Sequence, residues 1–147
     1  MKVSPTMQQL VQQLVERHGV DLCPRGAYLR LDLPEQDSLV IDHQGTAQMA
    51  VTQCFEECGA WRIDREVIFF TGYGEWIPLE ITQLATGWMA FAKLDAAGQR
   101  LVRINHCGQE KLAEFAERWA HKLLRQNWVE QGVPYAPWTP PSRQEVR

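Results

Sequence analysis

The sequence has no long apolar run: none of its segments approaches the roughly 18 to 20 apolar residues that a membrane-spanning helix requires. It also lacks the apolar stretch of a secretory signal, because the segment after the first five residues is rich in glutamine. Positive charge is not in excess either, since the net charge of the 147 residues is −3. We therefore expect a cytoplasmic protein that binds neither nucleic acid nor a membrane.

Signatures of catalysis are missing as well. The sequence contains no nucleophile elbow, no glycine-rich phosphate loop and no His-Glu-x-x-His zinc motif. We expect no cofactor, and the sequence favours a protein that is not an enzyme. One alternative stays open: a small-ligand-binding protein or enzyme with a pocket between sheet and helices, whose reactive group is Glu56, Asp64, Glu66 or a cysteine.

A disulfide framework is not indicated either, because the four cysteines are more typical of free thiols in a chain without a secretory signal. Cys54, Cys58, His106 and Cys107 are the residues that could surround a zinc ion. However, residues four apart on an extended strand are separated by roughly 13 Å, too far for two ligands of one ion. We therefore predict no metal site.

The residues that are present indicate a folded domain. Hydrophobic residues make up 45% of the sequence and it contains six tryptophans, so there is enough apolar area to offset the entropy of ordering the chain. The length is that of one domain. We place this domain at 1–131 and a proline-rich tail at 132–147.

The N-terminal segment predicts an amphipathic helix. Ser4 is a suitable N-cap and Pro5 a suitable first residue, and Gly19 ends the pattern. Between them, apolar residues recur every three or four positions: Met7, Leu10, Val11, Leu14 and Val15.

From about Ala27 to about His106 the apolar period changes to two, and turn residues follow at short intervals. This pattern predicts six or seven antiparallel strands, which include single strands over 88–94 and 101–104 joined by a loop at 95–98. Gln53 is a polar exception on an otherwise apolar face, and Pro78 favours an edge strand. Asp64 and Glu66 are expected on a solvated face.

A second amphipathic helix is predicted from about Gln109 to Trp128, with an apolar stripe of Leu112, Phe115, Ala116, Trp119, Ala120, Leu123 and Leu124. The fold class is therefore α+β: a curved antiparallel sheet packed against an N-terminal and a C-terminal helix, followed by the tail.

Aromatic residues follow one another where the chain leaves this helix. Trp128, Tyr135 and Trp138 alternate with prolines, and exposed aromatic rings dominate protein interfaces. We interpret the three as partner-binding residues. Docking of the same rings on the protein's own body is the alternative that the sequence leaves open.

Several short motifs resemble an uncharacterised bacterial domain family carried by plasmids and other mobile elements. They are Leu39-Val-Ile-Asp42, Phe55-Glu-Glu-Cys-Gly59, Asp64-Arg-Glu-Val-Ile-Phe69, Gly74-Glu-Trp76 and, near the end, Phe115-Ala-Glu-Arg-Trp119 with Gln126-Asn-Trp128. The family carries His-Tyr and Asn-Gly-Asp where this chain has Gln53-Cys54 and Cys58-Gly-Ala60, so the resemblance implies no activity. It implies a mobile-element context.

Together these observations predict a non-catalytic protein-interaction module, in its most specific form an inhibitor or adaptor encoded by a mobile element. Its partner is another protein, and a homodimer through a sheet edge is a further expectation.

Overall fold

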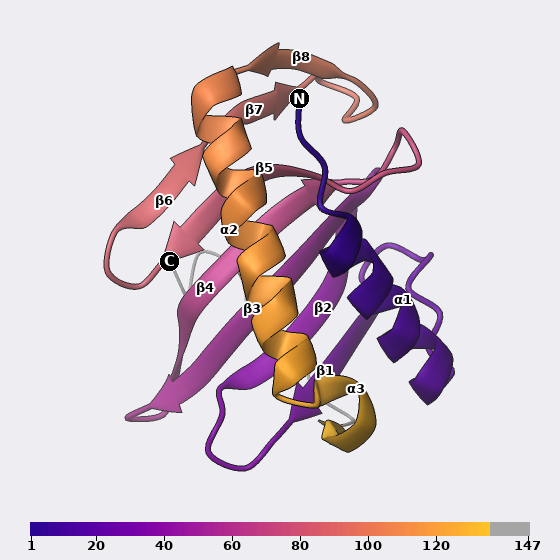
Figure 1. Cartoon of the computed structure of the whole chain (residues 1–147), viewed down its shortest axis with the longest axis vertical. Coiled ribbons are helices and arrows are strands. Elements are labelled where there is room, and N and C mark those ends of the chain that lie inside the picture. The colour runs from indigo at the N-terminus through magenta and orange to yellow at the C-terminus, as the bar shows by residue number, and fades with distance from the viewer. Residues whose placement is uncertain (136–147) are drawn as a thin grey trace.

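The computed structural model describes residues 1–135 and confirms the α+β fold class (Figure 1). Seven strands form one antiparallel sheet in the order β6-β5-β4-β3-β2-β1-β9, and β7 and β8 form a separate hairpin. The elements are α1 (Pro5–His18), β1 (Tyr28–Asp32), β2 (Ser38–Gly45), β3 (Gln48–Glu57), β4 (Ala60–Phe70), β5 (Ile77–Gln83), β6 (Gly87–Ala90), β7 (Ala92–Leu94), β8 (Leu101–Ile104), α2 (His106–Arg125), α3 (Trp128–Gln131) and β9 (Val133–Pro134).

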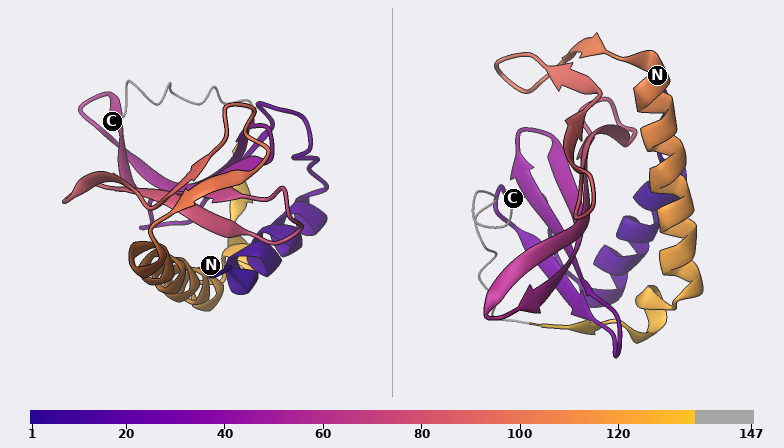
Figure 2. Two further views of the ribbon diagram at one scale, coloured as in Figure 1. Left: turned by 90° about the horizontal axis from the view of Figure 1, so that it is seen from above. Right: turned by 90° about the vertical axis from the view of Figure 1, so that its left-hand side faces the viewer.

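Both long helices cover the same side of the sheet, which we call the helix face; the opposite side is the far face (Figure 2). The main core lies between the helices and the helix face. There, apolar residues of both helices meet alternate residues of the central strands, among them Leu10, Leu31, Val51, Phe69, Trp119 and Leu123. None of the helices in residues 1–135 is both long and apolar enough to cross a membrane.

Gln53, the polar exception, is explained by a single contact. Its side-chain oxygen accepts a hydrogen bond of 2.9 Å from the indole N–H of Trp119 on α2. The amide thus satisfies the polar atom of one of the tryptophans in the main core, so its position on the apolar face is consistent with the fold.

The C-terminal helix differs from its predicted bounds. It begins at His106, where the Asn105 side chain accepts a hydrogen bond from the Gly108 N–H, and it ends at Arg125. Asn127 has a left-handed backbone conformation (φ 64°), which breaks the helix before α3. The chain then turns back to the sheet, where Val133 and Pro134 pair with β1. Part of the segment expected to be tail therefore belongs to the sheet, and residues 136–147 lie outside the described part of the chain.

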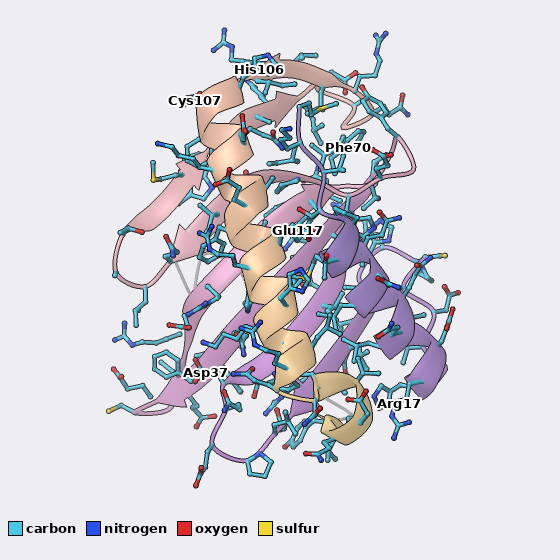
Figure 3. All side chains as sticks on the ribbon, viewed as in Figure 1. Arg17, Asp37, Phe70, His106, Cys107 and Glu117 are labelled. Carbon is cyan, nitrogen blue, oxygen red and sulfur yellow. The ribbon has the colours of Figure 1, made fainter. Side chains whose placement is uncertain are left out.

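The start of α1 also differs from expectation. Ser4 is buried, and its side chain makes no capping hydrogen bond. Instead, the free N–H groups of Thr6 and Met7 donate to the carboxylate of Glu117, which points from α2 toward the beginning of α1 (Figure 3). The cap comes from another helix because the two helices lie side by side.

The predicted strand over 88–94 is divided in two at Phe91. The Phe91 N–H donates to the Leu79 carbonyl, whereas its own carbonyl accepts from the Asn105 N–H, so the chain leaves the main sheet at this residue. The resulting β7–β8 hairpin packs over a second core cluster on the far face, which contains Ala50, Ile68, Phe70, Ile77 and Leu79. Pro78 is not on an edge strand but at a β-bulge in β5, where a ladder hydrogen bond is already interrupted.

Candidate functional site

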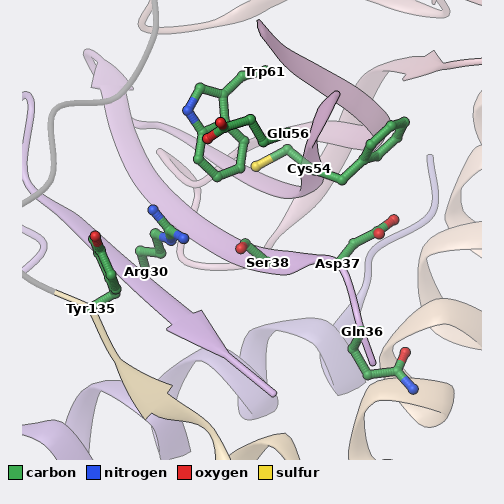
Figure 4. Close-up of a pocket in the computed structure, with 9 residues that line it drawn as sticks. Arg30, Gln36, Asp37, Ser38, Cys54, Glu56, Trp61 and Tyr135 are labelled. Carbon is green, nitrogen blue, oxygen red and sulfur yellow. The ribbon is translucent and has the colours of Figure 1, made fainter. Parts of the chain in front are cut away.

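A pocket opens on the far face beside the end of β3, with a volume of about 440 Å³ (Figure 4). Its lining comes from β1, β3, β4, the beginning of β2 with the segment before it, and the residue after β9, and includes Arg30, Asp37, Ser38, Cys54, Trp61 and Tyr135. The volume falls in the range of small-ligand pockets. What it can do chemically depends on the state of its polar groups.

Arg30 lines this pocket and has several partners. Its guanidinium lies 4.9 Å from the ring centre of Trp61 and 4.1 Å from that of Tyr135. It also forms a salt bridge of 3.2 Å with Asp32, whose carboxylate accepts a further hydrogen bond from Ser38. Since Arg30 is only 9% exposed, these contacts hold a largely desolvated cation in place.

The titratable groups of the pocket are not arranged for nucleophilic chemistry. Burial raises the pKa of the Cys54 thiol to about 12, against the opposing effect of the nearby Arg30 charge. Such a thiol is protonated at neutral pH and therefore unreactive. Burial, with the nearby Asp64 charge, also raises the pKa of Asp37.

The acidic residues that the sequence offered as reactive groups lie apart from one another. Glu66, expected on a solvated face, is fully buried on the far face and accepts a hydrogen bond of 2.9 Å from Thr52. Asp64 lies at a bulge and pairs with Arg65, and Glu56 is exposed at the rim of the pocket. The apolar core fills the middle of the space between sheet and helices, but a pocket of about 440 Å³ lies between α1 and the sheet. Cys23 lines this pocket, whereas Glu56, Asp64 and Glu66 do not.

The four residues considered for zinc are placed on different parts of the fold. Cys54 is buried on β3, and Cys58 is exposed in the turn after it. His106 and Cys107 are both exposed at the first turn of α2 (Figure 3). Within residues 1–135, no three His, Cys, Asp or Glu side chains are grouped so that they could hold a metal ion.

The three predicted partner-binding aromatics have different positions. Trp128 is completely buried in the main core, and its indole N–H donates to the side chain of Gln126. The prediction that Trp128 binds a partner is therefore corrected, because its ring packs against the protein's own body. Tyr135 is 51% exposed and stacks on Arg30 at the pocket rim. Trp138 lies outside the described residues.

A different surface exposes apolar side chains, and it was not identified from the sequence. Residues 84–90, which we call the β6 margin, are all exposed and comprise the turn 84–86 and the edge strand β6 of the main sheet. Leu84, Trp88 and Met89 each leave about half of their surface to solvent, with exposed fractions of 54%, 54% and 48%. The available signal was the absence of any charged residue between 84 and 92.

The backbone of the β6 margin also has open hydrogen-bonding positions. Strands β5 and β6 are antiparallel, and Phe91, which follows the last paired residue, donates to Leu79. Inward and outward groups alternate along an antiparallel strand, so Met89 bonds to β5 while Trp88 and Ala90 direct their N–H and C=O groups outward. β6 ends the sheet at this edge, so these outward groups face no other strand among the described residues.

A second pocket continues from the end of the β6 margin. It has a volume of about 320 Å³, and its lining includes Ala90, Phe91, Ala92, Lys93 and Arg103. Lys93 and Arg103 stand directly opposite each other on β7 and β8, and neither takes part in a salt bridge within the part of the chain that the structure covers. We call this the basic pocket.

Comparisons with known proteins found no match: no protein family, curated protein or solved structure corresponds to this chain.

Proposed function

We propose that this chain is a non-catalytic protein-binding domain that takes up an extended segment of another protein as an additional strand on β6. The observation that carries the proposal is the combination at the β6 margin of outward backbone groups with exposed Trp88 and Met89. Addition of a strand to a sheet edge is a common way for proteins to bind peptides, because main-chain hydrogen bonds supply affinity and neighbouring side chains supply specificity.

The contrast between the two edges of the sheet supports this proposal. Edge strands are usually protected by charged residues, by proline or by being very short. The β9 edge follows this rule, since it has only two residues and one is Pro134, which has no N–H. The β6 edge has four residues, no proline and no charge.

The side chains of the β6 margin are suited to hold a strand on both of its faces. Trp88 pairs with Thr82 and lies on the far face, whereas Met89 pairs with Ile81 and lies on the helix face. An incoming strand would therefore contact an aromatic ring on one side and a flexible thioether on the other. Both types of side chain are enriched in protein interfaces.

The most specific form of this proposal is an inhibitor or adaptor that is encoded by a bacterial mobile element. It would act in the cytoplasm on a larger protein. The support for this form is the resemblance of the short sequence motifs, together with the protonated, unreactive state of the Cys54 thiol in the pocket that it shares with Glu56.

The test is a selection of peptides on the full chain from a library of random dodecapeptides. Ala90→Pro removes an outward N–H without removing a β5–β6 hydrogen bond, so peptides selected on the wild type should bind this variant at least about tenfold more weakly. Binding should protect the Trp88 and Ala90 amides from hydrogen exchange.

Two further variants separate a local effect from misfolding. Met89→Lys places a charge on the same edge and should also weaken binding. Val133→Lys makes the same kind of change at the exposed β9 edge and should leave binding unchanged. If the selected peptides bind all variants equally, or protect other amides instead, the proposed binding surface is wrong.

A further inference from the structure

The basic pocket at the end of β6 identifies the chemistry of the partner. We infer that the segment bound at the β6 margin carries a large apolar side chain next to an Asp or Glu: the apolar group enters the basic pocket, and the carboxylate pairs with Lys93 and Arg103. This inference rests on the proposed function and adds to it the partner's side-chain requirement.

The apolar part of the pocket has a fixed shape. Phe91 lines it, and the backbone of this residue is held on both sides, by a hydrogen bond of 2.9 Å to the Leu79 carbonyl and one of 2.7 Å from the Asn105 N–H. Its ring lies against Gly108 at the start of α2, so closely that a Cβ atom at Gly108 would be 2.3 Å from it. A pocket held by two backbone bonds and a helix requires little ordering when a ligand binds.

Two cations of like charge stand side by side at the rim of the pocket. Lys93 and Arg103 are direct cross-strand neighbours, an arrangement that destabilises a strand pair because the like charges repel. Within residues 1–135, the salt bridges involve other arginines, namely Arg30, Arg62, Arg65 and Arg100. A carboxylate placed between Lys93 and Arg103 would remove their repulsion and add two charge-assisted contacts.

The basic pocket is continuous with the open edge. Ala90 belongs to both the β6 edge and the pocket: its backbone groups point outward from the edge, and the same residue lines the pocket. A strand added to β6 would run about 4.8 Å from it. Its residues beyond Ala90 would therefore lie next to the pocket that Phe91, Lys93 and Arg103 line.

The pocket's charge favours a different protein over a second copy of this chain. In an antiparallel self-pair centred on Met89, the outward residues Trp88 and Ala90 would face each other, and residues 85–87 of the second copy would reach the pocket. These residues are Ala, Thr and Gly, so they bring no carboxylate to Lys93 and Arg103.

The experiment extends the peptide selection with a second target, the full chain carrying Lys93→Gln and Arg103→Gln. Peptides selected on the wild type should be enriched in Asp or Glu beside a large apolar residue, and this enrichment should disappear on the double variant. For one selected peptide, changing its acidic residue to the amide should weaken binding roughly three- to tenfold on the wild type and hardly at all on the double variant. Hydrogen-exchange protection of Ala90 by the peptide should persist in both proteins.

The two proposals fail in different ways. Peptides that need β6 but show no acidic enrichment, or whose acid-to-amide change has the same effect on both proteins, overturn the inference and leave the protein-binding function intact. Failure to select any peptide that depends on Ala90 overturns both. A concentration-dependent dimer in sedimentation that Ala90→Pro abolishes would identify a second copy as the occupant and also overturn the inference.

Discussion

The indole N–H of Trp119 donates a hydrogen bond of 2.9 Å to the side-chain oxygen of Gln53, linking the middle of α2 to the helix face of the sheet. Both residues are nearly inaccessible to solvent, with 2% and 8% of their surface exposed. A buried hydrogen bond between two side chains fixes both the rotation of a helix and its position along a sheet, because either change would leave a polar atom without a partner.

We predict that Gln53→Leu lowers the free energy of unfolding by about 1–3 kcal/mol, because it leaves the Trp119 N–H buried and unpaired. Urea denaturation measures this change. Trp119→Phe removes the donor, so in the double variant the loss should be smaller than the sum of the single losses by at least about 0.5 kcal/mol. Gln9→Leu on the exposed side of α1 is the control and should change stability by less than about 0.5 kcal/mol. Additive losses would show that the hydrogen bond does not couple the two residues.

Gln53 illustrates how far the sequence determines this fold. The period of two around it predicts a strand, and the period near 3.6 around Trp119 predicts a helix, because both patterns depend only on local geometry. That the two side chains meet depends on how α2 is placed on the sheet, 66 positions along the chain. No local pattern contains that information.

The cap of α1 by Glu117 gives a second prediction. Glu117→Ala removes the acceptor of the Thr6 and Met7 N–H groups and should lower the free energy of unfolding by about 0.5–2 kcal/mol. Glu117→Gln should have a smaller effect, because the amide oxygen still accepts while the favourable charge at the helix N-terminus is lost. Thermal denaturation of both variants tests this order. Glu114→Ala, an exposed position on the same helix, is the control, and an equal loss there would contradict the capping role.

The same contact shows why the Ser4 prediction was wrong. Serine before proline is a frequent helix start, and the sequence correctly indicated where α1 begins. The backbone N–H of Ser4, however, is hydrogen-bonded to the Trp76 carbonyl, which places the residue in a buried position. The capping carboxylate comes from a residue more than one hundred positions away, and local sequence rules do not detect such a partner.

A third prediction concerns Gly108 and Phe91. Glycine in a helix is normally less stable than alanine by about 1 kcal/mol, so Gly108→Ala would be expected to stabilise α2. Here the added Cβ would lie 2.3 Å from the Phe91 ring, so we predict the opposite sign, a loss of about 1–3 kcal/mol. Combining Gly108→Ala with Phe91→Leu should recover part of that loss, because leucine can be accommodated in the reduced space. A stabilised single variant in chemical denaturation would contradict the close contact.

The candidate binding surface was less accessible to prediction than the fold. The sequence pattern over 88–94 is that of one strand, and only the hydrogen bonds of Phe91 reveal that the chain changes sheets there. Trp88 therefore lies at an open edge instead of within a continuous meander. Of the aromatic residues expected to bind a partner, Trp128 is buried, because α3 folds back onto the core.

The buried thiol of Cys54 predicts how stability depends on pH. Burial raises its pKa in the folded protein from 9.0 to about 12, so the folded state disfavours the thiolate that the unfolded chain can form. Below pH 9 the thiol is protonated in both states and its contribution to stability is complete. Between pH 9 and 12 only the unfolded state ionises, so this contribution falls by up to about 1.4 kcal/mol per pH unit as the pH rises.

Urea denaturation at pH 8.5 and 10.5 measures this loss when the wild type is compared with Cys54→Ala. Other groups also titrate in this range, so the relevant quantity is the difference in unfolding free energy between the two proteins, which should shift by about 2 kcal/mol in favour of the variant at the higher pH. Val40→Ala, a buried change on the same face that removes no titratable group, should keep a constant difference from the wild type. If Cys54→Ala also keeps a constant difference, the thiol is ionised with similar ease in both states, and its description as an unreactive, protonated side chain of the far-face pocket is wrong.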